Sequence, residues 1–99
     1  SGLPQRAYFE ALAAAFSKVR IPDAYLSFQA RRSVAPKRVE ADFLAANPGM
    51  DAKGFAAVCD DGALTEVRIC MTKELSFRRC DQVDRNACRA ASVNLPPIQ

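Results

Sequence analysis

The stretch LTEVRICM, residues 64–71, gives the clearest indication of fold in this 99-residue chain. Thr65, Val67, Ile69 and Met71 occupy alternate positions, and two of the residues between them are charged. A period of two is typical of a strand that buries one face. The pattern therefore predicts a β-strand over residues 64–71.

Two further strands are expected on either side of this one. The turn signal DDG at residues 60–62 follows an apolar run over residues 55–59, which predicts a strand and an antiparallel hairpin. The pair Lys73-Glu74 predicts a second turn, followed by a third strand over residues 77–80. Together the three strands would form a small antiparallel meander.

The first part of the chain has helical spacing instead. Pro4 suits the first turn of a helix, where its missing N–H costs nothing. Apolar residues then recur at helical spacing from Tyr8 to Val19, and Pro22 would end the helix. A helix is predicted over residues 4–19.

A second, shorter helix is predicted over residues 36–46. Pro36 fits its first turn, and Val39 and Phe43 form an apolar stripe. The run NPG at residues 47–49 would end it, because proline cannot continue the hydrogen-bond ladder and glycine tolerates positive φ.

Two N-terminal helices followed by an antiparallel meander predict an α+β fold for residues 1–99 as a single piece. A hydrophobic content of 49% with 25% charged residues is typical of a globular chain and excludes a disordered tail. The segments 23–35 and 81–99 are predicted to be irregular. Two or three strands are marginally stable alone, so the helices and cysteines are expected to complete the fold.

Four cysteines, Cys59, Cys70, Cys80 and Cys88, lie in the second half of the chain. An even number in a short chain indicates a disulfide framework and an oxidising compartment. A four-thiolate zinc site is the main alternative, but its ligands usually come in pairs about two to four residues apart, and no such pair is present. Free buried thiols are a further alternative. The spacing does not choose among the three possible pairings.

The chain contains no histidine, which excludes every mechanism that depends on an imidazole within this chain. The CxxC, GxGxxG and P-loop motifs are also absent. No pair of carboxylates has a spacing that signals catalysis or metal binding. The sequence thus supplies no catalytic, cofactor-binding or metal-binding residues.

Basic residues offer the remaining candidates. The formal net charge is +3, which allows contact with a polyanion but does not require it. Two arginine pairs, Arg31-Arg32 and Arg78-Arg79, are candidate contacts to RNA phosphates, and solvated surface is the alternative for both. A dedicated nucleic-acid-binding domain is disfavoured, because aromatic and basic residues are not interleaved.

The run ALTEVRICMTKEL, residues 63–75, resembles the C-terminal part of the ribonuclease T2 family. That family has a strand with the pattern L-x-E-V-R-I-C, and Cys59, Cys80 and Cys88 occupy the places of its neighbouring cysteines. The opening SGL with Tyr8-Phe9, and the ending SVNLPP at residues 92–97, are similar to bacterial members.

This resemblance implies the C-terminal portion of a secreted or periplasmic endoribonuclease, beginning just after the second catalytic histidine segment. Family members cleave single-stranded RNA through 2′,3′-cyclic phosphates, without metal or cofactor. This chain would lack the catalytic histidines, would be inactive alone, and would need the N-terminal half as its partner. The resemblance also implies the disulfides Cys59–Cys88 and Cys70–Cys80. The alternative function is a non-catalytic secreted binding module stabilised by disulfides.

Overall fold

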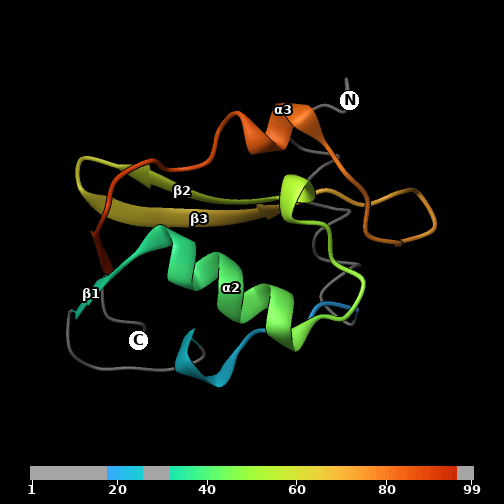
Figure 1. The fold of residues 1–99 in the computed structure, drawn as a ribbon, viewed down its shortest axis with the longest axis horizontal. Coiled ribbons are helices and arrows are strands. Elements are labelled where there is room, and N and C mark those ends of the chain that lie inside the picture. The colour runs from blue at the N-terminus through green and yellow to red at the C-terminus, as the bar shows by residue number, and fades with distance from the viewer. Residues whose placement is uncertain (1–17, 26–31, 96–99) are drawn as a thin grey trace.

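The computed structural model describes residues 18–25 and 32–95, which form an α+β fold, as predicted. Figure 1 shows a hairpin with helices packed on it. In chain order the elements are η1 (Asp23–Tyr25), β1 (Arg32–Val34), α2 (Pro36–Ala46), η2 (Ala52–Gly54), β2 (Phe55–Asp60), β3 (Ala63–Ile69), α3 (Asp81–Asp84) and β4 (Val93–Leu95). The predicted helix over 4–19 lies outside the described residues up to residue 17, and Lys18 and Val19 are not helical.

The predicted hairpin is confirmed as β2 and β3, which pair antiparallel from Phe55 opposite Ile69 to Asp60 opposite Ala63. Asp61 and Gly62 connect the strands with φ angles of 52° and 77°. Positive φ at both central residues is the signature of a two-residue turn whose twist matches that of the strands. The sequence DDG therefore forms the turn of the hairpin, and the register set at the turn shifts by one residue between Val58 and Cys59.

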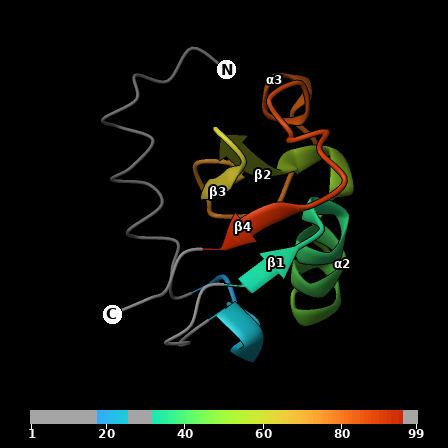
Figure 2. The same cartoon turned by 90° about the vertical axis from the view of Figure 1, so that its left-hand side faces the viewer.

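The sheet is mixed, so the prediction of a purely antiparallel meander is wrong. Over the described residues its strand order is β1-β4-β3-β2. The segment after α3 returns as β4, which lies parallel to β3 and antiparallel to β1 (Figure 2). β1 and β4 fall in segments that were predicted to be irregular, as do η1 and α3. Each of the two strands has only three residues, too few for a recognisable alternation.

The predicted strand over 77–80 is absent, and β3 ends at Ile69 rather than at Met71. A single bridge joins Met71 to Phe77, and the chain then leaves the sheet. Leu75 adopts a φ of 63° in the intervening turn. Residues 78–80 instead cross the segment around Gly54, where the Cys80 N–H donates to the Lys53 carbonyl oxygen.

Helix α2 has the predicted bounds, with Pro36 in its first turn. Asn47 ends it and is 3% exposed. The Asn47 side chain donates Nδ2–H to the carbonyl oxygens of Phe43 (2.9 Å) and Arg20 (2.8 Å), and its Oδ1 accepts the Arg20 N–H (2.6 Å). One buried amide therefore caps α2 and fastens the preceding segment to it.

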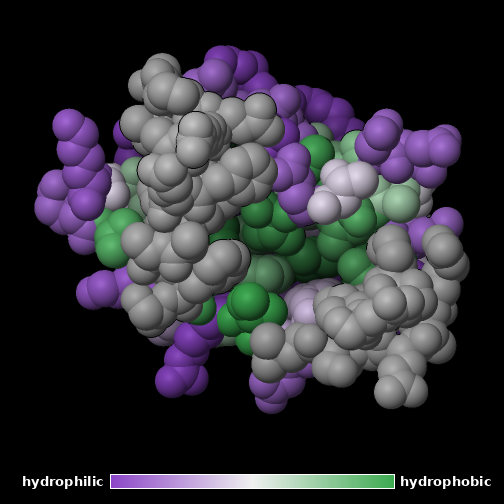
Figure 3. Space-filling model, turned by 180° about the vertical axis from the view of Figure 1, so that it is seen from behind, coloured by the Kyte–Doolittle hydropathy of each residue, from purple (hydrophilic) through white to green (hydrophobic). Residues whose placement is uncertain are grey.

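The main core lies between α2 and one face of the sheet. Phe43 of α2 packs against Phe55 of β2, with ring centroids 5.3 Å apart. Val19, Val39 and Ile69 are buried in the same cluster. Seen from the side opposite to Figure 1, hydrophobic side chains gather in a hollow (Figure 3).

A second, smaller core lies on the other side of the hairpin. It contains Ala56 of β2, Cys70 and Cys80, and Val83 of α3. All four are less than a tenth exposed. This cluster places the two thiols next to the arginine-rich segment that precedes α3.

Candidate functional site

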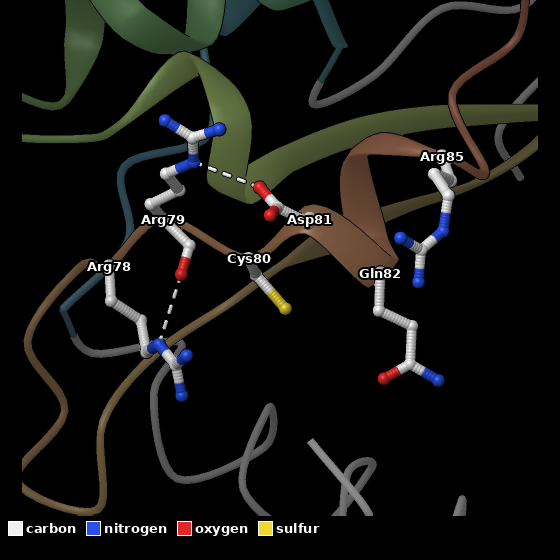
Figure 4. A pocket seen from close by; sticks show the side chains of 6 residues that line it. All are labelled: Arg78, Arg79, Cys80, Asp81, Gln82 and Arg85. Atoms are coloured by element: carbon white, nitrogen blue, oxygen red, sulfur yellow. Dashed lines mark hydrogen bonds and ion pairs between the residues drawn. The ribbon is translucent and has the colours of Figure 1, made fainter.

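A pocket of about 440 Å³ opens at the start of α3. Figure 4 shows the six residues that line it: Arg78, Arg79, Cys80, Asp81, Gln82 and Arg85. Three of them carry a positive charge and one carries a negative charge. The pocket is a shallow depression that is largely open to solvent.

Backbone hydrogen bonds fix the segment that forms this pocket. The Arg78 N–H donates to the Cys70 carbonyl oxygen (3.2 Å), and the Cys80 N–H donates to that of Lys53 (3.0 Å). The Cys70 N–H donates to the carbonyl oxygen of Gly54 (2.8 Å). The pocket is therefore held against the end of the hairpin by main-chain contacts.

Glycine is required at position 54 for this contact. A Cβ built on Gly54 would lie 2.0 Å from the carbonyl oxygen of Arg78. No side chain fits at that distance, because the opposing atom belongs to the backbone. The close approach of two main chains explains why residues 78–80 cross here instead of forming the predicted strand.

The charges of the pocket divide into a neutralised pair and two free cations. Arg79 Nε donates to Asp81 Oδ1 at 2.8 Å, and this hydrogen bond holds the pKa of Asp81 below its usual range. Arg78 Nε donates to the carbonyl oxygen of Arg79 (3.1 Å). Within residues 18–25 and 32–95, neither Arg78 nor Arg85 forms an ion pair with a carboxylate.

Cys80 lines the pocket, and its buried side chain lies in the same core cluster as that of Cys70. Burial raises the pKa of Cys70 to about 12, and the hydrogen bond to Cys80 adds to the rise. Burial also acts to raise the pKa of Cys80, but hydrogen bonds from Cys70 and the Val83 backbone, together with the charge of Arg78, lower it overall. Cys80 is therefore the thiol that ionises first.

Of the two predicted disulfides, Cys59–Cys88 is present, with the Cα atoms 5.4 Å apart. It joins the end of β2 to the segment after α3. Cys70 and Cys80 are free thiols in this structure, so the second predicted bridge is not formed, although the two side chains are in contact. A four-thiolate zinc site is incompatible with the Cys59–Cys88 disulfide.

The four arginines predicted to contact phosphate do not form one site. Arg31 lies outside the described residues. Arg32 is on β1, where it donates to the Ala24 carbonyl oxygen (2.9 Å) and lies over the ring of Tyr25, 5.7 Å from its centroid. Figure 1 places β1 and α3 at opposite ends of the molecule, so only Arg78 and Arg79 lie together.

Arg85 completes the pocket and was missed by the sequence analysis. It directly follows α3, whose short turn brings it back beside the segment that carries Arg78 and Arg79. The sequence predicts an irregular segment there, so it gives no reason to expect Arg85 near the other pocket residues. A sequence pattern that predicted helix α3 would have been needed to assign Arg85 to the pocket.

Other functional features are lacking in the part of the chain that the structure describes. It contains no group of three or more His, Cys, Asp or Glu side chains that could hold a metal ion. None of its helices is long and apolar enough to cross a membrane. Comparison with protein-family models, with curated proteins and with solved structures gives no match for this chain.

Proposed function

We propose that this chain is the C-terminal portion of a secreted or periplasmic endoribonuclease similar to ribonuclease T2. The complete enzyme would cleave single-stranded RNA by attack of the ribose 2′-OH on the adjacent phosphate, which leaves a 2′,3′-cyclic phosphate. Two histidines in an N-terminal portion would accept and donate the protons. The present chain would support that portion and would carry no catalytic residue.

The cysteine pairing is the observation that carries this proposal. Four cysteines allow three pairings, and the resemblance to the family implies one of them. Cys59 is bonded to Cys88, as that pairing requires, and Cys70 lies against Cys80. The other two pairings would join Cys59 to Cys70 or to Cys80.

A supporting role agrees with the composition of the chain. Acid–base cleavage of RNA near neutral pH needs groups that exchange protons there, and the chain has no histidine. A supporting segment can still affect the rate of cleavage, because displacing the catalytic groups by about 1 Å lowers the rate about 100-fold. The hairpin and its disulfide are suited to hold a neighbouring segment in place.

The proposed location follows from the same disulfide. Disulfides persist in extracellular and periplasmic compartments and are rare in the cytosol. The Cys59–Cys88 bond supports a secreted or periplasmic protein. No metal or cofactor is needed for the proposed reaction.

The sequence encoded upstream of Ser1 tests the proposal directly. We expect two histidine-containing segments in the same reading frame, preceded by a secretion signal. A short gene with a signal directly before Ser1 would contradict the proposal and would favour the non-catalytic binding module.

Activity measurements provide a second test. The purified 99-residue chain should not cleave single-stranded RNA, whereas the protein with its upstream segments should cleave it in the presence of a chelator. Mass spectrometry of the products should detect 2′,3′-cyclic phosphate ends. Cleavage by the 99-residue chain beyond that of a mock purification would refute the supporting role.

A further inference from the structure

Two exposed arginines face the same pocket, and neither forms an ion pair with a carboxylate among residues 18–25 and 32–95. Arg78 stands before α3 and Arg85 directly follows it, and both line the pocket. Asp81 is the only acidic residue among the lining residues that the structure describes, and Arg79 pairs with it at 2.8 Å. Two positive charges therefore remain available to a ligand.

The side chains are arranged so that these two charges border the opening. Figure 4 shows Arg78 and Cys80 extending to one side of the ribbon, and the Arg79–Asp81 pair extending to the other. The Arg78 Nε–H is occupied by the Arg79 carbonyl oxygen, which directs the remaining N–H groups of its guanidinium away from the backbone. The Arg85 guanidinium turns toward the same side.

The backbone beneath Arg78 is held in place before any ligand arrives. Its N–H is bonded to Cys70, and its carbonyl oxygen lies against Gly54. A preorganised donor loses less conformational entropy on binding than a donor on a mobile loop.

We infer that this pocket is a phosphate-binding subsite for single-stranded RNA, in which Arg78 and Arg85 donate hydrogen bonds to phosphodiester oxygens. Guanidinium groups match phosphate because their planar fork can donate two parallel hydrogen bonds. The volume of about 440 Å³ exceeds that of one phosphate and leaves room for the attached ribose. This inference rests on the proposed function, which makes single-stranded RNA the substrate.

Binding to the disulfide-bonded 99-residue chain can be measured by fluorescence anisotropy with a labelled oligouridine. Arg78→Ala and Arg85→Ala should each weaken binding about tenfold, because the loss of one hydrogen bond to a charged group lowers the affinity by about that factor. Each should also reduce the slope of log K against log salt by about 0.7. Inorganic phosphate should compete more strongly than sodium chloride of equal ionic strength.

Lys37→Ala is the matched control, because Lys37 is an exposed cation on α2 and its removal changes the net charge equally. It should leave the affinity nearly unchanged. The double variant Arg78→Lys with Arg85→Lys keeps the net charge but loses the forked donors, so it should bind more weakly than the original chain.

Three results would overturn the inference. These are equal weakening by Lys37→Ala and Arg78→Ala, unchanged affinity in the double lysine variant, and no binding of oligouridine to the chain. None of them bears on the upstream histidines, so the proposed function would stand. Conversely, arginine-dependent binding in a chain without upstream histidine segments would support the subsite and refute the enzyme.

Discussion

Gly54 and Arg78 are in direct main-chain contact: a Cβ on Gly54 would lie 2.0 Å from the carbonyl oxygen of Arg78. This contact presses the arginine-bearing segment against the start of β2. It also explains the departure of residues 78–80 from the sheet. The pocket at α3 depends on it, because Arg78, Arg79 and Cys80 all lie on that segment.

Gly54→Ala should therefore displace residues 78–80 and destabilise the protein. Forcing an extra methyl group into a packed region costs about 1–3 kcal/mol, and a backbone neighbour places the cost at the upper end. Urea unfolding would measure the loss. Gly49→Ala is the control: its Cβ would meet no atom within 4 Å, so only the strain of its φ of +90° is expected, and the pocket should be unaffected. Equal behaviour of the two variants would contradict the contact.

Cys80 should react with iodoacetamide at lower pH than Cys70. The thiolate is the reactive form, and its fraction rises as the pH passes the pKa. The pKa of Cys80 is lowered whereas that of Cys70 is raised to about 12, so Cys80 should react over a range in which Cys70 stays protonated. Peptide mass spectrometry after timed alkylation would give both rates, in a chain whose Cys59–Cys88 bond is intact.

The charge of Arg78 contributes to this difference. Arg78→Ala should shift the alkylation profile of Cys80 to higher pH, because a positive charge that stabilises the thiolate is lost. Arg38→Ala, on α2, removes a charge elsewhere and serves as the control. An unshifted profile in Arg78→Ala would show that the arginine does not act on the thiol.

Oxidation should join Cys70 to Cys80 without disturbing the existing disulfide. The two free cysteines are buried in the same core cluster, so we expect that little rearrangement is needed. The new bond should stabilise the protein by about 2–4 kcal/mol, although for so short a loop the gain should be near the lower end. Non-reducing peptide mapping would identify the bond, and recovery of a Cys59–Cys70 peptide would refute the pairing.

Asn47→Ala should be among the most destabilising substitutions in the chain. It would leave the Arg20 N–H and carbonyl oxygen without the Asn47 side chain as partner, and would remove one of the two hydrogen bonds to the Phe43 carbonyl oxygen. An unsatisfied buried polar group costs about 1–3 kcal/mol, so a total loss of about 2 kcal/mol or more is expected. Asn94→Ala, at an exposed position of β4, should change the stability by less than about 0.5 kcal/mol. Thermal unfolding of both variants would test the difference.

Local patterns in the sequence were sufficient for α2 and the hairpin. Pro36 and the run NPG mark both ends of the helix, and DDG supplies the two positive φ angles of the turn. Such signals depend on residues that are close in sequence, so contacts with the rest of the chain do not override them. The Cys59–Cys88 bond was anticipated from the resemblance and not from spacing.

The parts that were missed depend on contacts distant in sequence. β1 pairs with β4 through Arg32 opposite Leu95, and each strand has only three residues, too few to reveal it alone. The predicted strand over 77–80 does not form because Gly54, which has no side chain, allows the backbone of residues 78–80 to pack against it. Arg85 joined the pocket only through α3. In each case the residue that determines the local structure is distant in sequence from the segment that adopts it.

The Cys59–Cys88 bond also bears on self-association. β2 is at the edge of the described sheet, and an uncovered edge strand can template the addition of strands from another molecule. Here the Cys88 N–H donates to the Ala57 carbonyl oxygen at 2.7 Å, and the disulfide keeps this covering segment in place. Reduction would uncover that border of β2 and favour aggregation, so the bond guards the solubility of the protein as well as its fold.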